Sequence, residues 1–219
     1  MSTLSVTLFG HSPLEIGTRV QLVGAGGEPS GAILIAKERL PRLRMGDALG
    51  DAVQVLFRVL RIDWRPGVGI GPATRCVLVE ACAAVEAGAE LALTVRREGV
   101  ALAWVTLSDK GSRGEREDGA GPLAAQLIAE ALPLGHSAGF LLPDEELELR
   151  ALLTDLALVQ GADLIVTSGG TGVGPRDITP EATLAVIEKR LPGMERAMTA
   201  FSLLKTPHAV ISRAVAGTL

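Results

Sequence analysis

The chain has 219 residues and a formal net charge of −4, and 47% of its residues are hydrophobic while 21% are charged. These values lie near the globular average, so they exclude an intrinsically disordered chain. No stretch reaches the ~20 apolar residues that a membrane span needs. No basic segment of a signal peptide precedes the first apolar run either. We therefore expect a soluble, cytoplasmic protein with no membrane partner.

The charge distribution and the reactive residue types exclude further classes of protein. Residues 1–100 hold 11 Lys and Arg against 10 Asp and Glu, and residues 101–219 hold 10 against 15. Neither half has the basic excess of a nucleic-acid binder, so no nucleic-acid partner is expected. The two cysteines and three histidines are scattered, which predicts neither a disulfide framework nor a zinc site.

The first half of the chain predicts a small β-rich domain over residues 1–98. Short β-like runs alternate there with turns rich in glycine and proline. The runs cover residues 4–9, 19–23, 32–36, 53–62, 75–79 and 90–95. Strands that are short and closely spaced favour a small barrel or a sandwich.

The pattern changes near Arg96-Arg-Glu-Gly99, and residues 99–219 predict an α/β domain. Continuous apolar runs at 100–107 and 163–167 are typical of strands buried on both faces. The other expected elements are a polar loop from Ser108 to Gly121, a helix over 122–132, a short strand over 140–142, a helix over 144–160 that Gly161 ends, and a helix with Thr179 as N-cap and Pro180 as its first residue. This alternation of strands and helices predicts a mostly parallel sheet with helices on both faces.

The strongest local signal is the segment S-G-G-T-G-V-G-P-R-D-I-T-P at residues 168–180. It lies between a predicted strand and a predicted helix, where open α/β sheets bind ligands. Gly169, Gly170 and Gly172 have no Cβ, so the backbone can approach an anion and turn its N–H groups toward it. The segment is neither a Walker A loop nor a G-x-G-x-x-G fingerprint.

Two carboxylates flank this glycine-rich segment. Asp177 follows the glycines, and Asp144 ends the preceding strand within L-L-P-D-E. Because both belong at the same edge of the sheet, they could hold Mg²⁺ that is bound to substrate phosphates. Each also has a purely structural interpretation, since Asp144 is a suitable helix N-cap and Asp177 a suitable turn residue.

A third polar segment follows the strand at 100–107. Ser108 and Asp109 come at the end of this strand, and Asp118 lies near the start of the next helix. All three could contact a phosphate or a metal-bound water. Glu115 and Arg116 are interpreted as residues of a solvated loop.

These segments, in this order, resemble the MoaB/Mog family of molybdopterin-binding proteins, the molybdopterin adenylyltransferases. The matching strings are V-T-L-S-D-K-G-S-R-G at 105–114, D-G-A-G-P-L at 118–123, L-L-P-D-E at 141–145 and T-S-G-G-T-G-V-G-P-R-D-I-T-P-E-A-T at 167–183. The last string is specific, because relatives of the same fold carry different residues in this loop. The resemblance covers roughly residues 101–219.

The resemblance implies a three-layer α/β/α sandwich that transfers AMP from Mg²⁺-ATP to the terminal phosphate of molybdopterin. It implies that Asp144 and Asp177 are the catalytic, metal-binding pair. The residues that it assigns to substrate and phosphate binding are Ser108, Asp109, Asp118, Ser168, Gly169, Gly170, Thr171 and Gly172. It also implies a homotrimer, and the molybdenum-insertion protein is a possible further partner.

Three further expectations accompany the resemblance. The family continues beyond Val215-Ala-Gly-Thr-Leu219 into another strand, an N-L-P-G-x-P turn and a helix, so we expect a domain that lacks its last strand and helix. A MOSC-like fold is our hypothesis for residues 1–98, although Cys76 and Cys82 match no known version of the reactive cysteine of that fold. Alternative functions are a non-catalytic molybdopterin-binding scaffold and a nucleotide pyrophosphatase of the same fold.

Overall fold

The computed structural model describes residues 3–10, 12–25, 33–67 and 73–219. Its chain divides into two compact units. The first comprises residues 1–101 with 134–136, and the second comprises residues 102–133 with 137–219. We describe each unit by itself.

The first unit is a closed barrel of seven strands in the order β1-β3-β2-β6-β5-β4-β7. The strands are β1 (Thr3–Phe9), β2 (Arg19–Val23), β3 (Ile33–Ala36), β4 (Ala48–Gly50), β5 (Val55–Arg65), β6 (Thr74–Ala81) and β7 (Glu90–Arg96). Alternate side chains point inward because successive residues of a strand face opposite sides, as Leu4, Val6 and Leu8 do in β1. The expected β-rich fold is therefore confirmed as a barrel.

The predicted strands of the barrel match the observed ones with small shifts of their ends. The additional strand, β4, has three residues, too few for the alternating pattern that sequence analysis uses. Residue 32, the expected start of β3, lies outside the described residues, as do parts of the glycine-rich segments 24–27 and 66–72 that were expected to form turns.

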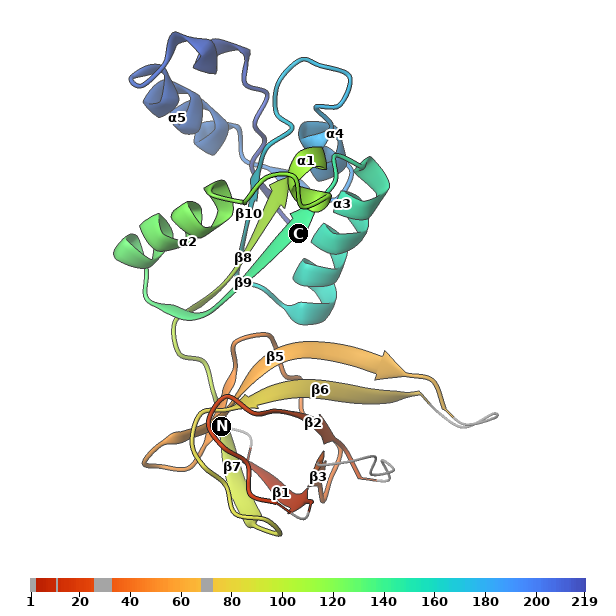
Figure 1. Cartoon of the computed structure of the whole chain (residues 1–219). Helices are drawn as coiled ribbons and strands as arrows, with labels where there is room; N and C mark the ends of the chain where they lie inside the picture. Colours follow the sequence, from red (N-terminus) through yellow and green to blue (C-terminus); the bar gives the residue numbers. More distant parts are fainter. Residues whose placement is uncertain (1–2, 11, 26–32, 68–72) are drawn as a thin grey trace. The chain divides into compact units, whose positions relative to one another are not determined.

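The second unit is built around a three-stranded sheet of order β10-β8-β9. Its elements are β8 (Val100–Leu107), α1 (Asp109–Ser112), α2 (Ala120–Ala131), β9 (Leu134–Leu142), α3 (Glu146–Thr154), a π-helix (Asp155–Gln160), β10 (Leu164–Ser168), α4 (Thr179–Leu184), β11 (Lys189–Arg190), α5 (Pro192–Leu203), a 3₁₀ helix (Pro207–Ile211) and β12 (Gly217–Thr218). β8 and β10 run parallel, with Thr106 opposite Ser168. α2 covers one face of the sheet and α3 the other, as Figure 1 shows. The layers agree with the expected α/β/α arrangement.

Glycines allow the central strand to pack closely against its neighbours. β8 buries most of its residues, and the indole of Trp104 lies against α2 and β9. A Cβ at Gly121 would lie 2.4 Å from this ring, and a Cβ at Gly139 would lie 1.9 Å from it. Any side chain at either position would overlap the indole, so both glycines are required by packing.

Several boundaries differ from those expected from the sequence. The strand predicted at 140–142 is the nine-residue β9, α2 begins at Ala120, and the polar loop contains the short helix α1. The helix expected over 144–160 continues from α3 into the π-helix. A π turn holds more residues than an α turn, and within this segment Val159 is 37% exposed while Gln160 is buried. Gly161 ends this helix with φ +66°, as expected.

Two further features of the second unit bear on the expectations. Thr179 is not an N-cap, because Ile178 occupies that position and Thr179 is the first helical residue of α4. None of the helices in the described ranges is long and apolar enough to cross a membrane.

Candidate functional site

The glycine-rich segment follows β10 and adopts a backbone that only glycine accepts readily. Gly169 has φ +100° and Gly170 has φ +58°, both in the left-handed region. A Cβ at Gly169 would lie 2.4 Å from the carbonyl oxygen of Leu107, at the end of β8. The loop therefore crosses the end of the neighbouring strand at a distance that excludes a side chain.

Asp144 lies beside this loop and is not a helix cap. The N-cap of α3 is Glu145, whose side chain makes no capping bond. The Oδ1 atom of Asp144 lies 3.3 Å from where a Cβ of Gly170 would be, and its Oδ2 accepts the N–H of Asp109 at 3.0 Å. The structural interpretation of Asp144 as an N-cap is therefore wrong, and the carboxylate is at the glycine loop as expected.

Asp177 lies at the other end of the same loop. Its Oδ2 accepts the N–H of Gly174 at 2.8 Å, which agrees with the turn role that the sequence left open. The same oxygen lies 2.8 Å from where a Cβ of Gly172 would be. A turn role and a ligand role are compatible, because Oδ1 accepts no hydrogen bond within the described residues.

Asp109 is held in an ion pair, and sequence analysis did not identify the partner. The guanidinium of Arg176 donates to both carboxylate oxygens of Asp109, at 2.8–3.2 Å, and to Oε1 of Glu145 at 2.9 Å. Arg176 holds the pKa of the Asp109 carboxyl below its usual range, and the N–H of Asp144 adds to this effect. The pKa of Arg176 is raised by Asp109 and Glu145, so the ion pair between Asp109 and Arg176 stays charged at neutral pH.

Ser108, Asp118, Ser168 and Gly169 line one cavity of about 270 Å³. Ser108 caps α1, since its Oγ accepts the N–H of Gly111 at 3.0 Å. Asp118 accepts the N–H groups of Ala120 and Gly121, each at 3.0 Å, and so stabilises the start of α2. Burial opposes ionisation of Asp118, but these bonds and the Thr106 hydroxyl outweigh it, so its pKa is lowered.

Arg116 also lines this cavity, and its side chain is exposed. The interpretation of Arg116 as a residue of a merely solvated loop is therefore incomplete. An arginine at the rim of a cavity formed by three predicted site segments is a cation that phosphate oxygens can reach. Its distance in sequence from the glycine loop concealed this position beside the cavity.

Asp144 and Asp177 are carboxylates of the site that could hold a metal ion. No group of three or more His, Cys, Asp or Glu side chains in the described part of the chain could hold a metal ion. Asp144 and Asp177 each keep one oxygen that accepts no hydrogen bond from another described residue. Mg²⁺ on substrate phosphates uses one or two carboxylates and otherwise water and phosphate oxygens, so the donor set fits Mg²⁺.

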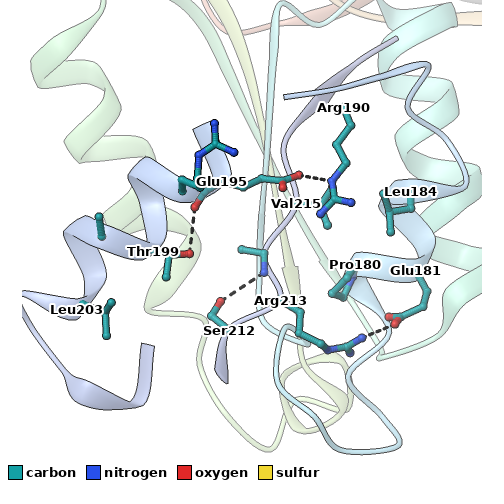
Figure 2. A pocket seen from close by; sticks show the side chains of 13 residues that line it. Pro180, Glu181, Leu184, Arg190, Glu195, Thr199, Leu203, Ser212, Arg213 and Val215 are labelled. Carbon is teal, nitrogen blue, oxygen red and sulfur yellow. Dashed lines mark hydrogen bonds and ion pairs between the residues drawn. The ribbon is translucent and has the colours of Figure 1, made fainter. Parts of the chain in front are cut away.

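A second arginine that the sequence did not indicate supports the glycine loop. Arg213 lies 41 residues after Gly172 in the chain, and its Nε donates to the carbonyl oxygen of Gly172 at 2.6 Å. Its second terminal nitrogen donates to the carbonyl oxygen of Asp177 at 2.6 Å. No local pattern reveals contacts over such a separation. A cavity of about 580 Å³ is lined by Arg213 and by none of the predicted site residues (Figure 2).

The C-terminal part of the chain is similar to known proteins. The family described as "Probable molybdopterin binding domain" matches residues 103–219. Molybdopterin adenylyltransferase of Haemophilus influenzae is 39% identical over 115 residues, which cover 52% of this chain and 58% of that protein. The enzyme of the same name from Pyrococcus furiosus is 40% identical over 117 residues, 52% of this chain and 66% of that one.

The fold of the second unit also has solved relatives. The crystal structure of the molybdopterin biosynthesis enzyme MoaB from Thermus thermophilus is 42% identical with a TM-score of 0.50, over 54% of this chain and 74% of that one. This chain spans somewhat more than half the length of the curated relative from Haemophilus influenzae. The matched segment begins within β8 and includes the glycine loop, Asp144, Asp177, Arg176 and Arg213. Since the family's pattern extends over more than half of the chain, the protein belongs to the family of molybdopterin-binding domains.

Proposed function

We propose that this protein is a molybdopterin adenylyltransferase of molybdenum cofactor biosynthesis. The observation that carries the proposal is the position of two carboxylates, Asp144 and Asp177, against a glycine loop. Relatives that share this segment are named molybdopterin adenylyltransferases. The substrates are then ATP and molybdopterin, and the products are adenylylated molybdopterin and pyrophosphate.

The chemistry needs positioning and charge neutralisation more than a covalent nucleophile. An oxygen of the terminal phosphate of molybdopterin attacks the α-phosphorus of ATP. The bond from that phosphorus to the bridging oxygen of pyrophosphate breaks, and pyrophosphate leaves. This route requires no reactive Cys or His at the site.

The residues present divide this work among them. The N–H groups of the loop around Gly170 bind phosphate oxygens, while Arg116 at the cavity rim supplies a mobile cation. Asp144 and Asp177 would hold Mg²⁺, which offsets negative charge on the phosphates when bound. Ser108 and Asp118 line the cavity beside the loop, which is large enough for part of a nucleotide.

The oligomeric state is a further part of the proposal. We propose a homotrimer, and α5 supports self-association because it buries none of its residues. Met194 is 55% exposed and Phe201 65% exposed on this helix, and apolar side chains that are exposed together mark protein–protein contacts. Light scattering on the purified chain should give three times the monomer mass. The proposed recipient of the product is the molybdenum-insertion protein.

The test of the activity is pyrophosphate release from Mg²⁺-ATP by the full chain, with and without molybdopterin. Release that depends on molybdopterin supports adenylyl transfer. Release without it indicates a nucleotide pyrophosphatase, and binding without release indicates a scaffold. Asp177→Asn should lower turnover by about 10²-fold, the scale of losing one preorganised charge contact. The matched control is Asp155→Asn, because within the described residues the Asp155 carboxylate accepts hydrogen bonds only from the amide of Gln160 in the same helix.

A further inference from the structure

The glycine loop shows an ordered pattern of carbonyl bonds that the proposed function does not by itself require. The carbonyl oxygen of Gly169 accepts the hydroxyl of Thr179 at 2.9 Å, and that of Gly170 accepts the N–H of Thr179 at 3.0 Å. The carbonyl oxygen of Thr171 accepts the N–H of Arg213 at 3.0 Å. That of Gly172 accepts the Nε of Arg213 at 2.6 Å. Four consecutive carbonyls are therefore bonded by two residues.

These bonds determine where the N–H groups of the loop point. In a planar trans peptide the C=O and N–H of one unit point in opposite directions. Drawing the four carbonyls toward Thr179 and Arg213 turns the next N–H groups away from those two residues. These are the N–H groups of Gly170, Thr171, Gly172 and Val173. None of the four donates a hydrogen bond to any other residue in the described ranges.

Both residues are held so that they can serve as anchors. Thr179 is 2% exposed and cannot turn toward solvent. Arg213 also donates to the carbonyl oxygen of Asp177 at 2.6 Å and to the carboxylate of Glu181, and Figure 2 shows its side chain directed at Glu181. Arg213 lowers the pKa of Glu181, so this anchoring ion pair persists at neutral pH. The guanidinium thus joins the middle of the loop, its end and α4.

We propose that Thr179 and Arg213 are positioning residues that hold the glycine loop as a row of four N–H donors for a phosphate group. This inference rests on the proposed function, because it names what prepares the same site. Four neighbouring donors suit a pyrophosphate or a terminal phosphate, whose oxygens can accept several N–H bonds at once. Neither residue touches the ligand; each acts through the carbonyl that it binds.

The test is calorimetric titration of the full chain with inorganic pyrophosphate and with ATP. Thr179→Val keeps the shape and the backbone N–H but removes the hydroxyl bond to Gly169, whereas Thr179→Ser restores that bond. Arg213→Met removes both side-chain bonds to the loop carbonyls, and Arg213→Lys restores one donor at most. We expect Thr179→Val and Arg213→Met to weaken pyrophosphate binding about tenfold or more, a plausible cost for losing one or two such bonds. Serine should restore wild-type affinity and lysine part of it.

The matched control is Arg190→Gln. Arg190 lines the same cavity as Arg213 and pairs with one glutamate, Glu195, but no bond joins it to the loop. The affinity of the Arg190→Gln variant for pyrophosphate should equal that of the wild type. The melting temperature of each variant separates a general loss of folding from a loss of order in the loop. If Arg213→Met does not fold, the comparison of Thr179→Val with Thr179→Ser still tests the inference.

Each outcome has a distinct meaning. Equal affinities in the wild type, Thr179→Val and Arg213→Met would overturn the inference, and so would a wild type that binds neither pyrophosphate nor ATP. If binding depends on Thr179 and Arg213 but no AMP is transferred to molybdopterin, the inference stands and the proposed function fails.

Discussion

Asp109 and Asp144 bind each other's backbone reciprocally. The N–H of Asp109 donates to Oδ2 of Asp144 at 3.0 Å, and the N–H of Asp144 donates to Oδ1 of Asp109 at 3.1 Å. The two residues follow β8 and β9, which neighbour each other in the sheet. This pair of reciprocal hydrogen bonds fixes the ends of both strands. It also places Oδ1, the remaining carboxylate oxygen of Asp144, beside Gly170.

The first prediction concerns the charge of Asp144. In Asp144→Asn the amide oxygen can still accept the N–H of Asp109, so the stability change should stay under ~1 kcal/mol. Turnover should fall by about 10²-fold, because a neutral amide is a poor ligand for Mg²⁺. Measurements of the adenylylation rate and the melting temperature of the variant test these two expectations. Near wild-type turnover would show that Asp144 only ties the two loops together.

A second prediction follows from the ion pair between Asp109 and Arg176. Because the pKa of folded Asp109 is depressed, the stability from this pair is present above the unfolded pKa of ~3.9. It is lost as the pH falls through the lower folded value. The melting temperatures of the wild type and Arg176→Gln should therefore differ by a constant amount from about pH 5 to 8, and the difference should shrink below about pH 4. A difference that grows on acidification would contradict the assignment.

A third prediction tests the space at Gly170. Gly170→Val should abolish binding of ATP and molybdopterin, since valine resists φ +58° and its Cβ would lie 2.6 Å from the hydroxyl of Thr179. Gly193→Ala is the control, because a Cβ at Gly193 meets nothing within 4 Å. Calorimetry should give wild-type affinities for the control and none for the valine variant. An unchanged affinity of Gly170→Val for both ligands would show that the loop is only a turn and does not bind them.

Strand positions and the glycine loop could be predicted from the sequence because both have local causes. The apolar run of β8 and the glycines after β10 occur in consecutive residues, so pattern and spacing reveal them. The N-cap at Thr179 was a wrong prediction for an instructive reason. The preference of threonine for N-cap positions is a local effect. Here, however, the hydroxyl and the N–H of Thr179 donate to the carbonyl oxygens of Gly169 and Gly170, at the start of the loop.

The two arginines of the site show what local patterns cannot provide. Arg176 reaches Asp109 across 67 residues of chain, and Arg213 reaches Gly172 across 41. An arginine in a polar loop has no signal that distinguishes an exposed cation from an anchor, since only the folded sheet brings the partners together. The π-helix at Asp155–Gln160 was not predicted either, because the sequence pattern was interpreted as one continuous helix over 144–160.

The last prediction addresses the division of the chain into a barrel over residues 1–98 and an α/β domain over 99–219. Phe57 is the largest fully buried side chain of the barrel core, and Phe57→Ala should cost about 3–5 kcal/mol through lost burial and the cavity that remains. If the two domains fold separately, this substitution lowers the melting temperature of one transition only. Affinity for pyrophosphate, which rests on the glycine loop, should stay at the wild-type value.

Limited proteolysis of Phe57→Ala should then cut within the barrel and near residues 97–101, and leave a resistant C-terminal fragment, because segments between domains hold few contacts. If pyrophosphate binding is lost together with the folded barrel, the two domains unfold as one unit.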